Sequence, residues 1–334
     1  MRVFVYEYLS SGAGGDTSGM ASLQTEGWAM LSAVLEDLIH CPGVRIGTLL
    51  DCRRAPPPHW SARIDVQRVR PATEQARFRA LAAAADWSLL IAPEFDGLLS
   101  ERSRWVEEDG GHLLGSSRAA IDQTADKLLL SRLWSSRGIP TPSSARKYPL
   151  VCKPRFGAGS QATFLIRDEE ELARARVQAR TEGWSGELIR QAFTPGLAAS
   201  VAFLAGGGQR HALPAVEQRL SSDGRFRYLG GRLPITDNLD RRARHLAERA
   251  VECVEGLRGW FGVDLVLGDA EDGSGDAVIE INPRLTTSYL GLRQRARFNL
   301  AEALLAVATD SPTPSWEWES DSIVFETDGR LFPG

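Results

Sequence analysis

The chain has 334 residues, of which 43% are hydrophobic and 25% are charged, and its formal net charge is -4. This composition is ordinary for a globular enzyme of two or three domains, and it gives no reason to expect nucleic acid or an anionic membrane as a partner. No apolar run reaches the roughly 20 residues that span a bilayer, no signal-peptide core follows Met1, and the four cysteines lack zinc spacing, so a reduced cytoplasm is the expected location.

Strands alternate with helices through the first third of the chain, which is typical of a parallel, doubly wound sheet. Strands are predicted at residues 2–9, 44–50 and 87–92, helices at 23–39 and 73–85, a Gly/Ser-rich loop at 10–19 and a Pro-rich loop at 56–58. Ligands of such sheets bind at the carboxyl ends of the strands. Glu7, Asp51 and Glu94 are therefore expected along one edge, together with the Gly/Ser-rich loop.

Two further regions, beginning near Gly115 and Glu187, mix strands and helices in a way that indicates α+β subdomains. The first is predicted to hold helices at 122–137 and 168–182 and strands at 150–154 and 162–166. The second is predicted to hold strands at 188–193, 200–204, 211–216, 261–267 and 277–281, a helix at 237–257, and an edge strand at 323–326. The expected fold class is α/β followed by α+β, with domains at 1–115, 116–186 and 187–334.

The segment 278–284 carries the clearest chemical signal in the chain. Glu280 and Asn282 stand two positions apart on a predicted strand, so their side chains point to the same face. A carboxylate and an amide oxygen side by side suit Mg²⁺ better than a softer metal. A hairpin would bring Asp264 beside them, and Arg284 places a cation just beyond the strand. The alternative is an edge strand with polar residues on its solvent face.

Two lysines stand at positions where they could contact phosphate. Lys153 ends a predicted strand just before the loop 156–161, whose small residues could wrap a phosphate chain with backbone N–H groups. Lys127 follows Asp126 in a predicted helix. The loop is not a Walker loop, because no Gly-Lys-Ser/Thr occurs here. The alternatives are a solvated turn at Lys153 and a surface position for Lys127.

The order of these motifs resembles the ATP-grasp superfamily from about residue 115 to 310. The resemblance is carried by Asp126-Lys127, Lys153 with its Gly loop, the stretch Gln191-Ala192-Phe193-Thr194-Pro195-Gly196, and then Asp264, Glu280, Asn282 and Arg284. It implies a pre-ATP-grasp domain at 1–115, a lid subdomain at 116–186 and a C-terminal subdomain at 187–334 that carries the metal site. The two ATP-grasp subdomains would clamp ATP between them.

The resemblance also implies roles for individual residues. Arg284 and Lys153 would be catalytic, and Asp264, Glu280 and Asn282 would hold Mg²⁺, with Mn²⁺ as an alternative metal. The nucleotide would be bound by Lys127, Lys153, Gly157, Gly159, Ser160, Gln191, Ala192, Phe193 and Thr194. One position departs from the pattern: Ala198 stands where many members carry a ribose-binding Glu.

Further motifs look like the tyramine–L-glutamate ligase branch of this superfamily. They are Glu7-Tyr8 with its Gly-rich loop, Glu26-Gly27-Trp28, Ala92-Pro93-Glu94, Tyr228-Leu229-Gly230-Gly231 and the stretch from Asn282 to Tyr289. This branch implies an amide bond formed through an acyl phosphate, between glutamate and tyramine or a similar amine, in the biosynthesis of a methanofuran-like one-carbon cofactor.

The expected partners are thus a small carboxylate and a small amine, and a homodimer is an open alternative to a monomer. Candidate substrate residues are Glu7, Glu217, Tyr228, Thr286 and Thr287, each weighed against an ordinary surface or core role. Three other functions stay open: a ligase for another amino acid or peptide pair, a kinase-like relative, and a nucleotide-binding regulatory module without turnover.

Overall fold

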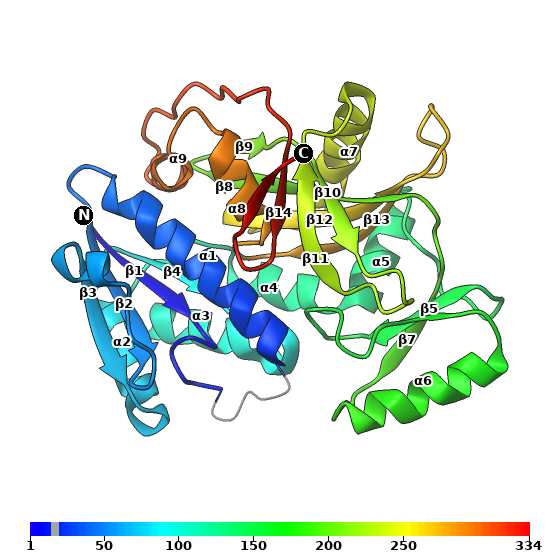
Figure 1. Cartoon of the computed structure of the whole chain (residues 1–334), viewed down its shortest axis with the longest axis horizontal. Coiled ribbons are helices and arrows are strands. Elements are labelled where there is room, and N and C mark those ends of the chain that lie inside the picture. Colours follow the sequence, from blue (N-terminus) through cyan, green and yellow to red (C-terminus); the bar gives the residue numbers. More distant parts are fainter. Residues whose placement is uncertain (15–19) are drawn as a thin grey trace.

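The computed structural model describes residues 1–14 and 20–334, so part of the loop expected at 10–19 lies outside the described residues. Figure 1 shows three bodies: an N-terminal sheet with its helices, a small sheet with one long helix, and a large sheet that joins them. In the described ranges, each helix is either too short or too polar to cross a bilayer.

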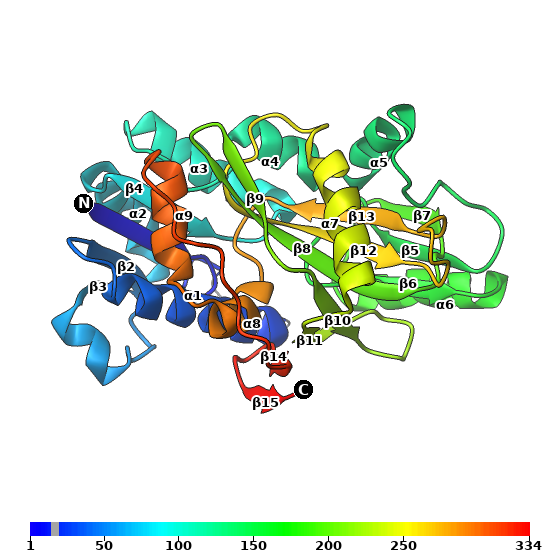
Figure 2. The same cartoon turned by 90° about the horizontal axis from the view of Figure 1, so that it is seen from above.

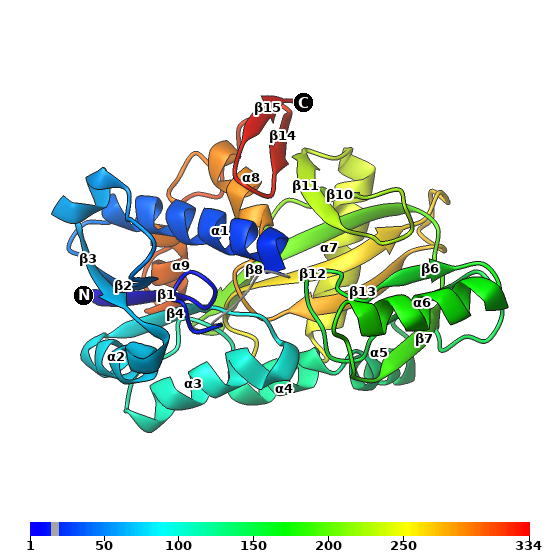
Figure 3. The same cartoon turned by 60° about the horizontal axis from the view of Figure 1, so that its bottom comes forward.

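The N-terminal body is the doubly wound parallel sheet that the sequence predicts. Its strands run in the order β3 (Ile64–Val69), β2 (Arg45–Asp51), β1 (Arg2–Glu7) and β4 (Trp87–Ile91), and all neighbours are parallel. Helix α1 (Ala21–Ile39) covers one face, and α2 (Pro71–Ala84) and α3 (Leu98–Glu108) cover the other (Figure 3). Strand β3 and helix α3 were not among the expected elements.

Burial on both faces explains why residues 3–6 of β1 form an unbroken apolar run. Val3 and Val5 belong to the same buried cluster as α1, whereas Phe4 and Tyr6 belong to the cluster of α2 and α3. Alternate residues of a strand point to opposite faces, so a strand between two helical layers needs apolar side chains at every position.

The single helix expected at 122–137 is wrong, because the structure has two helices that meet at Asp126. Helix α4 (Arg118–Ala125) ends there and α5 (Lys127–Ser136) begins. Asp126 has an extended backbone, and its side chain accepts hydrogen bonds from the N–H groups of Leu128 and Leu129. A residue that caps the start of a helix has a non-helical backbone, so Asp126 cannot also continue α4.

The small sheet has the order β6 (Phe164–Ile166), β5 (Leu150–Pro154) and β7 (Leu188–Ala192), and α6 (Glu169–Thr181) covers it. All its pairings are antiparallel. Because β7 pairs with β5 along its whole length, this sheet extends past residue 186, where the sequence suggested a boundary.

The large sheet contains β13 (Ala277–Asn282), β12 (Gly259–Leu267), β8 (Leu197–Gly206), β10 (Val216–Leu220), β11 (Tyr228–Leu233), β14 (Ile323–Glu326) and β15 (Leu331–Pro333), in that order, and β9 (Gln209–Ala212) pairs with β8. The strand expected at 211–216 is wrong, because Leu213-Pro214 separates β9 from β10 and proline cannot donate to a ladder. The helix α7 (Asp237–Val251) stops short of the expected residue 257. Strand β14 does fold back, but β15 covers its outer side.

Helices cover both faces of the large sheet, and on one face they pack against α1 of the N-terminal body. Helix α7 lies over one face (Figure 2). On the other face, α8 (Ser288–Arg295) and α9 (Leu300–Ala308) share a buried cluster with α1. Asp37 of α1 accepts hydrogen bonds from Tyr289 and Arg293 of α8, with 2.6 Å between Arg293 Nη2 and Asp37 Oδ1. Charged and apolar contacts thus fix the first helix against the last two.

A substitution at Phe78 would test the packing of the N-terminal core. Its ring is fully buried and lies 4.7 Å from the ring of Tyr6 and 5.4 Å from that of Phe4. We expect Phe78→Ala to lower the free energy of unfolding by about 3–5 kcal/mol, measured by urea denaturation, because it leaves a cavity in a packed core. Val177→Ala on α6, where the side chain is 65% exposed, is the control and should change stability by less than about 0.5 kcal/mol. Equal effects of the two substitutions would contradict this packing.

Candidate active site

A cavity of about 590 Å³ lies where the three bodies meet. It brings together nearly all the residues singled out from the sequence: Glu7, Lys127, Lys153, Gly157, Gly159, Ser160, Gln191, Ala192, Phe193, Thr194, Tyr228, Asp264, Glu280, Asn282, Arg284, Thr286 and Thr287. These residues come from distant parts of the sequence, so the cavity exists only when all three bodies are in place.

Glu217 is the expected residue that the structure does not place in the cavity. It sits on β10 opposite Arg232 of β11, and Arg232 Nη2 lies 2.7 Å from its carboxylate. Its neighbour Gln218 points to the other face, lines the cavity and donates from Nε2 to Asp264 at 2.9 Å. Adjacent residues of a strand point to opposite faces, so Glu217 faces away from the cavity while Gln218 faces into it.

The acidic pair at the centre of the cavity is set by strand register. Strands β12 and β13 are antiparallel, and Asp264 is directly opposite Glu280. Asn282 donates from Nδ2 to Asp264 Oδ2 at 2.9 Å. Burial and the nearby charge of Glu280 raise the pKa of Asp264 to about 7. Burial would also raise the pKa of Glu280, but Lys127 and Lys153 hold it below its ordinary value.

These side chains fit a hard divalent cation. Asp264, Glu280 and Asn282 offer only oxygen ligands, and the Asn282 amide leaves its Oδ1 for a metal while Nδ2 bonds Asp264. In the described part of the chain, no cluster of three or more His, Cys, Asp or Glu is arranged to hold a metal. A cation bound here would therefore need Asn282 and the oxygens of its ligand to complete its coordination, as Mg²⁺ often does with phosphates.

Two lysines face this acidic pair. Lys127 lies 3.1 Å from Glu280 Oε2 and also donates to the carbonyl oxygen of Gly157 at 2.8 Å. Lys153 is buried on β5, and among the described residues no carboxylate is within ion-pair distance of its ammonium. Burial lowers the pKa of Lys153 from its ordinary value to about 8. The cavity thus contains a cation that an anionic ligand could stabilise.

Asp126 fixes where Lys127 points, a role that no local sequence pattern indicates. The Arg155 guanidinium bonds both Asp126 oxygens, at 2.8 and 2.6 Å, while Asp126 also caps α5. This pair ties the start of α5 to the chain that follows β5. Lys127 is therefore held beside the loop 156–161.

The loop 156–161 is held on both sides. A side chain at Gly159 would collide with Leu23 of α1, since its Cβ would lie 2.6 Å from Leu23 Cδ2, and Gly159 has a positive φ of 66°. On the other side, Ser160 Oγ donates to the carbonyl oxygen of Phe226 at 2.7 Å. The loop therefore lies closed over the cavity in this structure.

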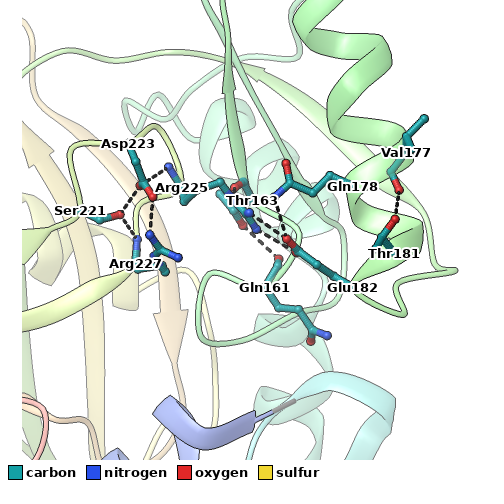
Figure 4. A network of polar contacts seen from close by, with 10 residues as sticks. All are labelled: Gln161, Thr163, Val177, Gln178, Thr181, Glu182, Ser221, Asp223, Arg225 and Arg227. Carbon is teal, nitrogen blue, oxygen red and sulfur yellow. Dashed lines mark hydrogen bonds and ion pairs between the residues drawn. The ribbon is translucent and has the colours of Figure 1, made fainter. Parts of the chain in front are cut away.

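We call residues 221–227, which join β10 to β11, the latch turn, because they bind the small sheet and its helix. Figure 4 shows Arg225 reaching Glu182 and Thr163. Its two Nη atoms each lie 2.8 Å from a Glu182 oxygen, and Nε donates to the Thr163 carbonyl oxygen at 2.9 Å. The N–H of Leu165 also donates to the carbonyl oxygen of Gly224 at 2.7 Å. The latch turn holds the small sheet over the cavity.

The end of β7 and the residues that follow it form another wall. Gln191 is buried and donates from Nε2 to the Pro142 carbonyl oxygen at 3.1 Å, which leaves Oε1 as an acceptor. The rings of Phe193 and Phe226 lie 6.3 Å apart, and both line the cavity. Ala198 also lines it and offers no polar side-chain atom. This apolar wall with one amide suits a planar heterocycle.

Arg284 lies at the border with the N-terminal body. Its Nε is 2.9 Å from Glu94 Oε1, and Glu94 follows β4. Burial would lower the pKa of Arg284, but Glu94 keeps it above its ordinary value. Glu94 was expected at the edge of the N-terminal sheet, and there it orients a cation of the large sheet. Thr286 also lines the cavity, but its hydroxyl is bonded to Trp260 and Ser288.

The latch turn can be tested by hydrogen exchange. Arg225→Leu should speed amide exchange at Leu165 and in the loop 156–161 by about five- to thirtyfold, since losing a bidentate ion pair costs about 1–2 kcal/mol. Arg174→Leu is the control, because Arg174 pairs with Glu170 within α6. The latch would be refuted if both variants exchanged like the parent protein.

The burial of Lys153 predicts a pH-dependent gain in stability on its removal. With a folded-state pKa of about 8, the folded protein bears the full cost of the charged lysine below pH 8, and that cost fades as pH rises toward the unfolded pKa of about 10.4. Lys153→Met should raise the free energy of unfolding at pH 7, by at most about 3 kcal/mol, and by less near pH 9.5. Urea denaturation at both values checks this.

The matched control for Lys153 is Lys147→Met, because Lys147 is exposed. It should change stability by less than about 0.5 kcal/mol at either pH. A loss of stability in Lys153→Met at pH 7 would mean that attraction to the acidic pair outweighs burial.

Comparisons with known proteins agree with this geometry. Residues 124–288 match the ATP-grasp domain family, and residues 44–121 match the pre ATP-grasp 3 domain family. Tyramine–L-glutamate ligases from Methanocaldococcus fervens and Methanocaldococcus jannaschii are each 28% identical to the chain. The two alignments cover 74% and 67% of this chain and 71% and 63% of those proteins.

A solved structure of an ATP-grasp superfamily protein from Archaeoglobus fulgidus is similar over nearly the whole chain. It has a TM-score of 0.72 and 25% sequence identity, and the match covers 98% of this chain and 92% of that one. Together with the two domain matches, this likeness identifies the chain as a member of the ATP-grasp superfamily.

Proposed function

We propose that the protein is an ATP-dependent carboxylate–amine ligase that forms an amide through an acyl phosphate. The observation that carries this proposal is the meeting, in one cavity, of an oxygen-only ligand set, two lysines and Arg284. Phosphoryl transfer needs mainly positioning and neutralisation of negative charge, and this cavity offers both.

In the first step, an oxygen of the substrate carboxylate attacks the γ-phosphorus of ATP, and the bond to the β-phosphate oxygen breaks. Lys153 and Lys127 contact the phosphates, and Arg284 faces the transferred phosphoryl group. Asp264, Glu280 and Asn282 would hold Mg²⁺, which supplies charge neutralisation to the phosphates when bound. The products of this step are an acyl phosphate and ADP.

In the second step, the amine nitrogen attacks the carbonyl carbon, the carbon–oxygen bond to phosphate breaks, and phosphate leaves. The acyl phosphate must be kept from water until the amine arrives. The loop 156–161, closed between Leu23 and the latch turn, serves as that cover. Gln191 to Thr194 bind the adenine.

The substrate pair that we favour is L-glutamate with tyramine or a similar amine, in the biosynthesis of a methanofuran-like cofactor. The names of the two curated relatives support this pair. Tyr228, Thr287 and Arg284 line the cavity, where Thr287 contacts Glu26 and Arg284 contacts Glu94, both from the N-terminal body.

The direct test is Mg²⁺-dependent ADP formation with L-glutamate and a panel of amines that begins with tyramine. We expect ADP release to require both substrates and to match the amide formed. ADP release with the carboxylate alone would indicate a kinase-like relative. ATP binding without ADP formation across the panel would indicate a nucleotide-binding module.

Arg284 is the residue whose removal should be most damaging to turnover. We expect Arg284→Ala to lower amide formation about 10²–10³-fold, as the loss of one preorganised partner of transition-state charge does. Arg297→Ala is the control, because Arg297 is an exposed residue that pairs with Glu319 outside the cavity. Arg284→Ala with near-normal turnover would remove Arg284 from the mechanism.

A further inference from the structure

Among the described residues that line the cavity, one carboxylate lacks the partners that the other three have. Glu280 is paired with Lys127, Asp264 accepts from Asn282 and Gln218, and Glu7 accepts from the backbone N–H groups of Leu9 and Ser10 at 3.0 and 2.6 Å. Glu7 is thus a structural residue that orders the loop after β1.

The remaining carboxylate is Glu26, in the second turn of α1. Its partners are two hydroxyls: Thr287 Oγ1 donates to Oε2 at 3.2 Å, and Ser22 Oγ donates to Oε1 at 3.3 Å. Within residues 1–14 and 20–334, no lysine, arginine or histidine nitrogen lies within ion-pair distance of Glu26. Its charge is therefore free to bind a cationic ligand.

Glu26 lies beside the reacting end of the cavity. Thr287, which bonds the Glu26 carboxylate at 3.2 Å, stands three residues after Arg284 in the chain, and the negative charges of Glu26 and Glu280 both act on Arg284. The Arg284 guanidinium forms its ion pair with Glu94. Glu26 therefore has no direct ion pair with Arg284. A group bound at Glu26 would thus stand next to the residue that faces the phosphoryl group.

The surroundings of Glu26 suit an amine with an apolar or aromatic body. Leu23, Met30 and Ile91 line the same cavity, as does Tyr228. Burial raises the pKa of Tyr228 well above its ordinary value, and the charge of Glu26 adds to the shift. The hydroxyl of Tyr228 is therefore neutral, and it lines the same cavity as Glu26.

A purely structural role does not account for Glu26. The bond to Thr287 links α1 to the start of α8, but Asp37 already joins these two helices through Tyr289 and Arg293. The α1–α9 packing adds a shared apolar cluster. Helix α1 would keep its place without the carboxylate at Glu26.

We propose that Glu26 and Thr287 form the subsite for the protonated amine. The Glu26 carboxylate binds the ammonium group and takes one proton from it, which leaves a neutral amine to attack the acyl phosphate carbonyl. As the new carbon–nitrogen bond forms and the carbon–oxygen bond breaks, the departing phosphate accepts the second proton. This inference rests on the proposed ligase function and names the residue that selects a cationic amine.

The test compares a charged and an uncharged nucleophile in Glu26→Gln, which keeps both hydroxyl contacts within reach and removes the charge. Tyramine is a cation near neutral pH, whereas hydroxylamine is mostly neutral and traps acyl phosphates. We expect KM for tyramine to rise about tenfold or more, because the ion pair is lost from a partly buried site. The kcat/KM for hydroxylamine and the KM for ATP should each change by less than about twofold.

Glu36→Gln is the control, because Glu36 lies on the same helix, faces Arg293 and is outside the cavity. It should leave the KM of both nucleophiles unchanged. An equal rise for tyramine and hydroxylamine in Glu26→Gln, or no rise for either, would overturn the inference. If Glu26→Gln unfolds below the assay temperature, Glu26→Asp replaces it. That variant should raise KM for tyramine by a smaller factor and leave kcat/KM for hydroxylamine unchanged.

Calorimetric binding of tyramine to the ATP-bound protein separates this inference from the ligase function. Tyramine binding that weakens about tenfold in Glu26→Gln would support the subsite, even if the parent protein formed no amide. Amide formation in the parent protein together with Glu26-independent tyramine binding would remove the subsite and leave the ligase function intact.

Discussion

The site depends on one unfavourable contact, the placement of Asp264 directly across the β12–β13 ladder from Glu280. Like charges opposite each other in a sheet are destabilising. The protein tolerates them through Lys127 and through the amides of Gln218 and Asn282. All these partners are groups that a metal and a phosphate chain could replace or join. One lysine and two amides thus supply part of the stabilisation that this acidic pair requires.

The sequence predicted the centre of the site better than its edges. Glu280 and Asn282 were recognisable because a two-residue spacing on a strand needs no tertiary information. The doubly wound sheet also followed from local patterns, but β3 and α3 did not, since β3 has a half-exposed pattern and α3 is rich in charge. The break between α4 and α5 lies at a single residue, Asp126, and the face on which Glu217 lies changes if β10 is shifted by one residue. Local patterns do not place an element's ends that finely. Contacts such as Arg225 with Glu182 had no local signature, because they join segments 43 residues apart.

Each wall of the cavity is held by a different body of the protein. Glu94 of the N-terminal body orients Arg284 of the large sheet, and Leu23 of α1 lies against Gly159 of the loop 156–161. Ser160 in turn bonds Phe226 of the latch turn. The loop thus contacts both neighbouring bodies at once, so the proposed exclusion of water depends on the N-terminal body and on the large sheet together.

The packing of α1 against α8 and α9 also has a consequence for synthesis on the ribosome. Asp37 bonds the side chain of Asn299, which is added 262 residues later. At roughly 5–20 residues per second, that interval lasts on the order of 13 to 50 seconds. Throughout it, the apolar side of α1 that later meets α9 has no native cover. The first helix therefore waits for the last two, and its packing against α9 is completed only near the end of synthesis.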